Sequence, residues 1–180
     1  MRIGVGLSGG IDSATSALLL LKEGHEVAGY TMLLADGGEQ AAEKAARIAG
    51  LLGIRHRVLD FREAFEECIL EYFISEYAIG RTPSPCVRCN RLVKFGKLLE
   101  AVLQDGCDML ATGHYARRLL RDGRDFLARG LDRKKDQSYF LAQLDRSQYS
   151  KVLFPLAEME KNTTRELAIA LGETLAAQPE

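Results

Sequence analysis

Hydrophobic positions in the first half of the chain alternate between two spacings, one typical of strands and one typical of helices. Short apolar and β-branched runs at 2–7, 26–34, 56–60 and 109–112 each predict a strand. Between them, apolar residues recur three or four positions apart, which predicts helices over 12–23, 39–52, 61–77 and 90–104. Strands that alternate with helices of this length indicate an α/β fold with a parallel sheet.

The pattern changes after residue 115. Asp122 and Gly123 separate two runs at 115–120 and 124–129, which is a strong signal for a β-hairpin. One helix is expected over 136–144 and another over 163–171, the latter opened by the capping-box spacing of TTRE. The second half therefore predicts a hairpin followed by helical segments.

Composition and charge narrow the class of protein. A hydrophobic content of 47% over 180 residues is ordinary for one soluble domain, and every apolar run is too short to span a membrane. We find no signal peptide, so we expect a cytoplasmic protein in which Cys86 and Cys89 stay reduced and serve metal binding or catalysis. The 24 Lys and Arg against 25 Asp and Glu show no basic excess, which argues against an autonomous nucleic-acid binder.

A glycine-rich turn, GLSGGIDS at 6–13, follows the first strand and opens the first helix. Gly9 and Gly10 permit positive φ and close approach of a ligand, and Ser8 and Ser13 add hydroxyl donors. The free N–H groups of the helix N-terminus favour phosphate. Asp12 is better explained as a ligand for a phosphate-bridging Mg²⁺ than as a helix cap, which is the alternative. The predicted nucleotide-binding residues are Gly6, Leu7, Ser8, Gly9, Gly10, Ile11, Asp12 and Ser13.

The string SGGIDS resembles the signature of the PP-loop ATP pyrophosphatases. Four further blocks follow in order: TPSPCVRCNRLVKFG (82–96), ATGHYAR (111–117), KKDQSYFLAQL (134–144) and LFPLAEMEK (153–161). Together they resemble the catalytic domain of the tRNA-specific 2-thiouridylases. The resemblance implies a sulfurtransferase that uses ATP and Mg²⁺ to adenylylate the 2-oxygen of the wobble uridine in tRNA, after which sulfur displaces AMP. A sulfur-donor protein is the implied second partner.

The same resemblance implies roles for individual residues. Cys89 matches the catalytic cysteine, and Asp12 acts beside it through Mg²⁺. Met32 and Gly113 match further ATP contacts. Ser84, Pro85 and Cys86 match the stretch that meets the target base, and Lys135, Asp136 and Gln137 match a tRNA contact.

The other chemical side chains leave alternatives open. We expect Cys89 at the start of the 90–104 helix, where the helix N-terminus, Arg88 and Arg91 would lower the pKa of its thiol. Cys86 and Cys89 together supply half of a tetrahedral set, for an iron–sulfur cluster or another soft metal, unless Cys86 touches the base instead. The remaining expectations are that Cys68 and Cys107 are core thiols, that His114 is a packing or capping histidine, and that Tyr139 and Phe140 are core residues rather than a base-stacking platform.

The chain departs from the resembled family in length. Family members are about twice as long, with a second functional cysteine and β-rich domains beyond the equivalent of residue 180, and they supply further tRNA contacts. We therefore expect a nucleotide-binding domain over 1–115, a hairpin and helical extension over 116–180, and weak tRNA binding by this chain alone. Two rivals stay open: a PP-loop enzyme that adenylylates a small molecule, and a non-catalytic ATP-binding or sulfur-carrier subunit.

Overall fold

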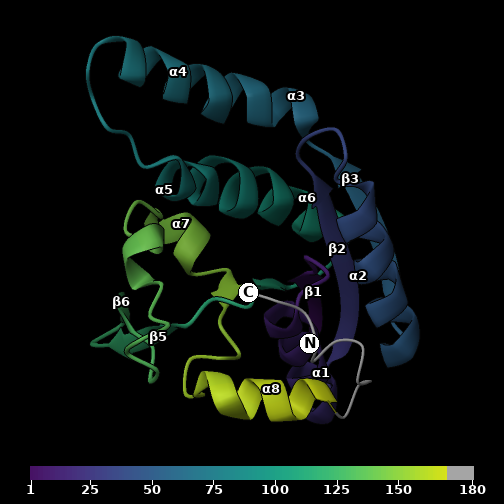
Figure 1. Cartoon of the computed structure of the whole chain (residues 1–180). Coiled ribbons are helices and arrows are strands. Elements are labelled where there is room, and N and C mark those ends of the chain that lie inside the picture. Colours follow the sequence, from purple (N-terminus) through teal and green to yellow (C-terminus); the bar gives the residue numbers. More distant parts are fainter. Residues whose placement is uncertain (170–180) are drawn as a thin grey trace.

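A five-stranded parallel sheet forms the centre of the molecule (Figure 1). The computed structural model describes residues 1–169. Its strands are β1 (Arg2–Gly6), β2 (Glu26–Leu33), β3 (Arg55–Asp60), β4 (Met109–Ala111), β5 (Ala116–Arg121), β6 (Arg124–Arg129) and β7 (Val152–Leu153). The parallel sheet has the order β3-β2-β1-β4-β7, and β5 pairs with β6 in a separate antiparallel hairpin. The predicted α/β class is confirmed.

Helices cover both faces of this sheet (Figure 1). The helical segments are α1 (Ile11–Lys22), α2 (Glu39–Leu52), α3 (Arg62–Phe65), η1 (Glu66–Leu70), α4 (Glu71–Ala78), α5 (Pro85–Cys89), η2 (Asn90–Leu98), α6 (Leu99–Gln104), η3 (Ser138–Leu141), α7 (Arg146–Tyr149) and α8 (Lys161–Ile169). On one face lie α1 and α2, with α8 against α1. On the other lies the continuous α5–η2–α6 helix, with α3–η1–α4 outside it.

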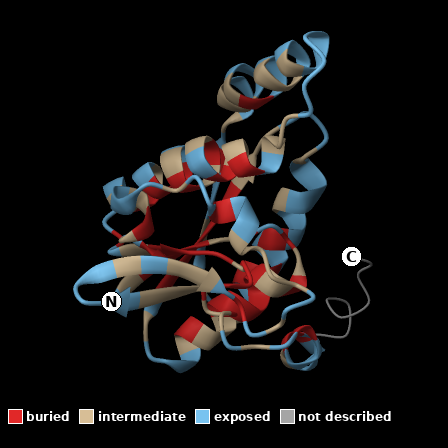
Figure 2. Cartoon of the chain, turned by 90° about the vertical axis from the view of Figure 1, so that its left-hand side faces the viewer, coloured by how far each residue is buried: buried red, intermediate tan, exposed pale blue. Residues whose placement is uncertain are grey.

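Burial on both faces explains why the central strands are apolar throughout. Ile3 and Val5 of β1 are fully buried, as expected for a strand between two helical layers. Ala17 and Leu20 of α1 pack in a hydrophobic cluster with β1 on one face of the sheet, whereas a larger cluster that includes Phe95 lies on the α5–η2–α6 face. Figure 2 shows the buried residues concentrated along the sheet and the outer α3–η1–α4 helix largely exposed.

The first half matches the predicted elements closely. Helix α2 covers the predicted residues 39–52 and ends at Gly53, which has φ +66°, a left-handed C-cap conformation suited to glycine. The hairpin is also confirmed, with Asp122 and Gly123 at φ +50° and +69°, as its two-residue turn requires.

Two expectations for the second half are wrong. Residues 136–144 form only the short η3 turn, because Asp136 accepts hydrogen bonds from Gly130 N at 3.0 Å and Ser138 Oγ at 2.8 Å and fixes a loop there. Helix α8 begins at Lys161, so the TTRE string lies inside the helix and is not its cap. A capping box occurs instead at Asp145 and Gln148 in α7. Residues 170 and 171 of the predicted 163–171 helix lie outside the described residues.

The C-terminal part returns to the central sheet. Strand β7, which the sequence pattern does not reveal, pairs in parallel with β4. The predicted boundary between residues 115 and 116 stays a prediction. Within the described residues, the search for an apolar helix of membrane-spanning length finds none.

Candidate active site

Residues 6–13 form a tight turn between β1 and α1. Gly9 has φ +81°, as predicted. Gly10 has φ −95°, so positive φ was wrong there. Ser13 Oγ accepts a hydrogen bond from Ser8 N at 3.2 Å and donates one to Gly10 O at 3.0 Å. The two serines therefore fix the shape of the turn in front of the N-terminus of α1, where free N–H groups favour an anion.

Two neighbouring elements hold this turn in place. Thr31 of β2 donates its hydroxyl to Leu7 O at 2.7 Å and also lies 2.8 Å from His56 Nε2. Because the single hydroxyl proton is used on Leu7, His56 is the donor in the second bond. A Cβ on Gly9 would lie 2.9 Å from Lys44 Cβ, so α2 leaves no room for a side chain at that position.

A cavity of about 400 Å³ opens in front of the turn. It lies at the carboxyl end of β1, where the neighbouring strands β2 and β4 continue the sheet in opposite directions, the usual ligand position in such folds. The predicted residues that line it are Gly6, Leu7, Ser8, Asp12, Ser13, Met32, Cys89, Gly113 and Gln137. Its other lining residues include Thr31, Lys94, Thr112 and His114. Residues from stretches of the chain that lie far apart in the sequence thus share one chamber.

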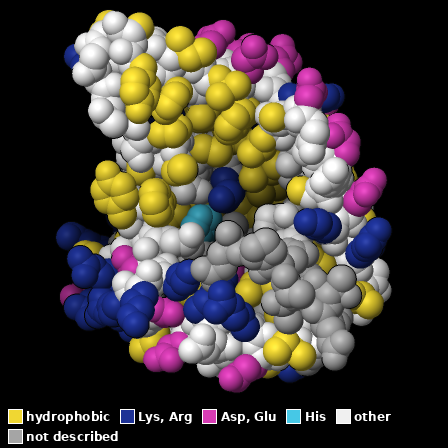
Figure 3. All heavy atoms as spheres, viewed as in Figure 1, with side chains coloured by type: hydrophobic (Ala, Val, Ile, Leu, Met, Phe, Trp, Pro, Cys, Tyr) yellow, Lys and Arg dark blue, Asp and Glu magenta, His cyan; other side chains and the backbone are white. Residues whose placement is uncertain are grey.

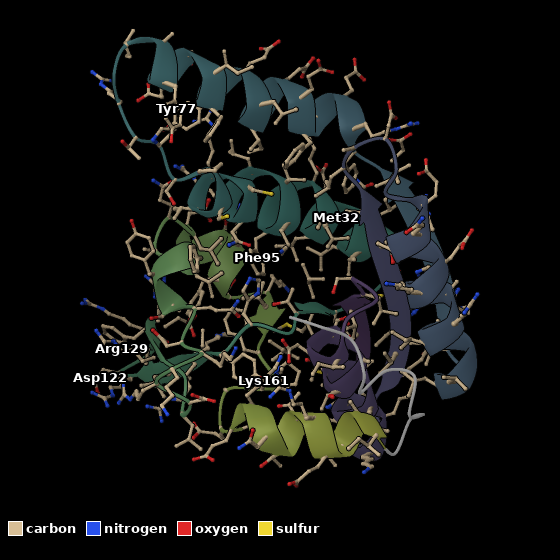
Figure 4. The ribbon with its side chains drawn as sticks, in the orientation of Figure 1. Met32, Tyr77, Phe95, Asp122, Arg129 and Lys161 are labelled. Carbon is tan, nitrogen blue, oxygen red and sulfur yellow. The ribbon has the colours of Figure 1, made fainter. Side chains whose placement is uncertain are left out.

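Asp12 is held by a lysine and a tyrosine from distant parts of the chain. Lys161 Nζ donates to Asp12 Oδ1 at 2.7 Å and to Oδ2 at 2.8 Å, and the Tyr115 hydroxyl donates to Oδ1 at 3.0 Å. The Lys161 side chain is only 10% exposed and the Asp12 side chain 33%. Burial is the main reason that the pKa of the Tyr115 phenol is raised. In Figure 4, Lys161 lies at the start of α8, below the centre of the molecule.

Cys89 lies on the cavity wall but not at a helix N-terminus. Its helix begins at Pro85, because proline is well tolerated at the first helical position, and continues without a break into η2. Burial raises the pKa of the Cys89 thiol, and the Lys94 ammonium opposes that rise. The predicted lowering of this pKa is therefore wrong. Arg88 points elsewhere, with Nε 2.7 Å from Cys68 O.

Lys94 and His114 complete the polar lining beside Cys89. Burial lowers the pKa of the Lys94 ammonium, while the Cys89 and Cys86 thiols favour its charged form. Burial, with a smaller effect from Lys94, lowers the pKa of His114 to about 3. His114 Nδ1 lies 2.8 Å from Thr112 Oγ1 and its ring packs near Phe95, so it is a neutral packing histidine, as expected.

Several predicted residues lie outside the cavity lining. Gly9, Gly10 and Ile11 form the back of the turn, and Cys86 is exposed on α5. Ser84 lines a separate groove. Pro85 is the first residue of α5. Lys135 and Asp136 belong to the loop before η3, and of the three predicted residues in that loop only Gln137 lines the cavity. Over residues 1–169, no group of three or more His, Cys, Asp or Glu side chains is placed to hold a metal ion.

The exposure of Tyr139 and Phe140 contradicts the prediction that they are core residues. Tyr139 is 67% exposed and Phe140 36%. Their rings meet edge to face with centroids 5.6 Å apart. Of the other two cysteines, Cys107 is buried as expected, and Cys68 is half-buried.

The sequence matches the tRNA methyl transferase HUP domain family over residues 1–180. The chain belongs to this family. Among relatives of this HUP domain, the tRNA-specific 2-thiouridylase MnmA of Syntrophomonas wolfei is 47% identical, covering 100% of this chain and 53% of the relative. The enzyme of the same name from Syntrophotalea carbinolica is 49% identical, covering 93% and 50%. The resemblance carried by the five sequence blocks is confirmed, and the chain spans about half the length of the curated relatives it matches.

Solved structures share the fold of this HUP domain at low sequence identity. A 4-thiouridine synthetase in complex with RNA and ATP superposes with a TM-score of 0.67 at 18% identity, covering 99% of this chain and 42% of that one. The glutamine-dependent NAD⁺ synthetase of Acinetobacter baumannii, in complex with ADP, gives 0.63 at 14% identity, covering 98% and 32%. These likenesses confirm the PP-loop ATP pyrophosphatase fold.

Sequence reasoning missed three side chains that shape the HUP-domain site: Lys94, Tyr115 and Lys161. Each lies inside a block that carries the family resemblance, and this was the available signal. Their partners are Cys89 and Asp12, and contacts between residues as much as 149 positions apart do not follow from local periodicity.

Proposed function

We propose that this HUP domain is the catalytic part of an ATP-dependent sulfurtransferase that converts the wobble uridine of tRNA into 2-thiouridine. The relatives named tRNA-specific 2-thiouridylase support this proposal. The observation that carries it is the shared cavity: the phosphate turn, with Ser8, Asp12 and Ser13, faces the same space as Cys89. Adenylylation and attack by sulfur need such a chamber, because ATP modifies the 2-oxygen of the base and sulfur then attacks the carbon that carries this oxygen.

The cavity suits a nucleotide triphosphate bound along the turn. The N–H groups at the start of α1 and the hydroxyls of Ser8 and Ser13 would meet phosphate oxygens, and Met32 would lie toward the adenine. Mg²⁺, when bound, would neutralise the pyrophosphate leaving group. One carboxylate together with phosphate oxygens is a usual Mg²⁺ site, so Asp12 fits this role provided that Lys161 moves off its two oxygens.

Cys89 is the sulfur-handling residue of the proposal. Sulfur is delivered as a persulfide, whose terminal sulfur attacks C2 of the activated base as AMP leaves, and a second thiol then cleaves the S–S bond. Cys89 supplies one of these two thiols in the proposal, and the Lys94 ammonium favours the anionic form of its thiol. A sulfur-donor protein would load the sulfur. An iron–sulfur cluster does not fit residues 1–169, because Cys86 and Cys89 have no third ligand beside them.

A basic surface supports tRNA over a small-molecule substrate. Residues 116–135 contain eight arginines and lysines and only three aspartates, and Figure 3 shows Lys and Arg gathered on the side where Figure 1 has β5 and β6. Arg121, Arg124 and Arg129 on this hairpin are exposed. The net charge of −1 over the whole chain therefore does not describe this face. Fold alone would not separate the two substrate classes.

Product analysis tests the proposal. With Mg²⁺, an unmodified tRNA transcript and ATP labelled in the α-phosphate, we expect labelled AMP and adenylylated RNA, with pyrophosphate as the other product. Asp12→Ala should abolish both. In the presence of a persulfide donor, Cys89→Ser should release pyrophosphate but form no thiouridine detectable by mass spectrometry, whereas Cys68→Ser, a half-buried cysteine outside the cavity, serves as the matched control. Formation of ADP and phosphate would exclude the proposed chemistry, and tRNA-independent turnover would favour a small-molecule substrate.

A further inference from the structure

A second hollow lies beside the cavity, on the outer side of the helix that carries Cys89. It has a volume of about 240 Å³, and its lining includes Tyr72, Ser84, Arg88, Tyr139 and Gln143. We call it the Tyr139 groove. Building on the proposed function, we propose that the Tyr139 groove binds an unpaired nucleobase adjacent to the target uridine, stacked on the ring of Tyr139.

The exposed aromatic ring is the first reason. Two-thirds of the Tyr139 surface is open to solvent, although burial of such a ring is usually favourable. Phe140 supports it edge to face from behind. Exposed aromatic rings are the usual stacking platforms for splayed bases of single-stranded RNA, and a base of any identity has a face that can stack.

Rigid support is the second reason. The Asn90 side chain, only 5% exposed, donates to Phe140 O at 3.1 Å and ties the aromatic pair to the helix of Cys89. Gln137 N donates to Tyr115 O at 2.9 Å, and the Asp136 carboxylate closes the loop just before it. The platform is therefore preorganised, which reduces the entropic cost of binding a flexible strand.

The polar lining is the third reason. The Arg88 guanidinium lies 4.2 Å from the centroid of the Tyr72 ring and is fixed by its Nε bond to Cys68 O. Its Nη atoms have no hydrogen-bond partner within residues 1–169, and Arg88 lines the groove together with Ser84 and Gln143, whose hydroxyl and amide groups are further polar groups of the lining. Such a set suits a base edge or a phosphate better than an apolar peptide.

Position relative to the cavity is the fourth reason. Gln137 lines the cavity and Tyr139 lines the groove, and residues two apart have Cα atoms no more than about 7.6 Å apart. A strand that places one base against Cys89 therefore brings its neighbour to Tyr139. The basic hairpin lies next to the same segment, since its strand β6 packs against η3, and it would meet the backbone phosphates.

The test uses the 180-residue chain and an anticodon stem-loop RNA with 2-aminopurine placed on either side of the target uridine. Stacking on Tyr139 should quench the fluorescence at one of the two positions. We expect Tyr139→Ala to abolish the quenching and to weaken RNA binding by roughly 5- to 100-fold, whereas Tyr139→Phe keeps both. Tyr77→Ala is the matched control, because Tyr77 is another exposed tyrosine, 53% exposed, on α4 (Figure 4).

The outcomes separate this inference from the proposed function. ATP binding without RNA should be equal in all variants, which also shows that they are folded. If Tyr139→Ala binds RNA as tightly as Tyr77→Ala, or if Tyr139→Phe is as weak as Tyr139→Ala, the stacking assignment is overturned and the proposed function stands. If the unaltered chain binds no RNA at any concentration, the stacking assignment is overturned, and the product analysis above decides the proposed function.

Discussion

The ion pair between Asp12 and Lys161 should be an energetic link between the first and the last described helix. The Lys161 ammonium is nearly inaccessible to solvent and donates to both carboxylate oxygens of Asp12, at 2.7 and 2.8 Å. Breaking a fully buried pair costs about 3–5 kcal/mol, and an exposed pair is worth about 0–1 kcal/mol. Because Asp12 is a third exposed, we expect a coupling energy between these limits, about 1–3 kcal/mol.

A double-mutant cycle measures this coupling. Urea unfolding at pH 7 is followed for the unaltered chain, Asp12→Asn, Lys161→Met and the double variant. Lys161→Met keeps the buried stem, so lost packing contributes little. Asp12→Asn should be the more costly change, because it leaves the deeply buried ammonium facing a neutral acceptor. Equal m-values would show that all four proteins expose the same surface on unfolding.

The control cycle uses Arg62→Met and Asp36→Asn, a surface pair 2.8 Å apart for which no measurable coupling is expected. A coupling energy below about 0.5 kcal/mol between Asp12 and Lys161 would be no larger than the deviation from additivity seen for independent sites, and it would refute the reasoning. The same outcome would remove the argument that Lys161 must give way before Asp12 binds Mg²⁺.

Three further outcomes follow from the cavity. Gly113→Ala should abolish ATP binding in calorimetry without unfolding the protein, since its Cβ would lie 2.9 Å from Asp12 Cβ and 3.0 Å from Ser13 N; Gly50→Ala, with open space around it, should bind normally. The pKa of His114 is lowered to about 3 in the folded protein, so below pH 6.5 the unfolded chain binds a proton at this residue that the folded chain does not bind. The free energy of unfolding should therefore fall between pH 7 and 5 by on the order of 1–2 kcal/mol more than it does in His114→Gln. Urea unfolding measures this difference, and His25→Gln is the control. Lys94→Met should raise the pKa of the Cys89 thiol further and slow its alkylation at pH 7 by roughly threefold or more, as read at the Cys89 peptide by mass spectrometry. Lys97→Met, which changes an exposed lysine, should leave the alkylation rate unchanged. Equal rates in Lys94→Met and the unaltered chain would contradict the pairing of Lys94 with Cys89.

The backbone of the nucleotide site was predictable because its determinants are local. The turn at Gly9 and the hairpin at Asp122 and Gly123 each need a left-handed conformation that few residues adopt readily, so the sequence marks them directly. Helix α2 ends where Gly53 permits a left-handed cap. Parallel strands are apolar runs whose carboxyl ends meet at one edge of the sheet, which explains why Met32 and Gly113, matched by the family resemblance, line one cavity with the turn that follows β1.

The chemistry of Cys89 was not predictable in the same way. The helix was expected to begin after Cys89, since two prolines precede it, but Pro85 occupies the first helical position and the helix starts one turn earlier. That shift removes the helix N-terminus as the source of a low thiol pKa. What remains is burial, which works against the thiolate, and Lys94, which works for it. Both depend on packing against other elements, and neither is encoded in the spacing of the two cysteines.

Net charge says little about where an anion binds, for a related reason. A total of −1 describes a sum over the whole chain, whereas charges more than a Debye length of about 8 Å apart barely interact at physiological salt. A phosphate group in the cavity would meet the N-terminus of α1 and Lys94, with Lys161 bonded to Asp12, and acidic residues on the outer surfaces of α3 and α4 would contribute little. The same reasoning applies to RNA at the hairpin and the loop that follows it, where residues 116–135 carry eight positive charges and three negative ones. For this fold, the distribution of charge along the carboxyl edge of the sheet is the informative quantity, and it becomes available only once the strand order is known.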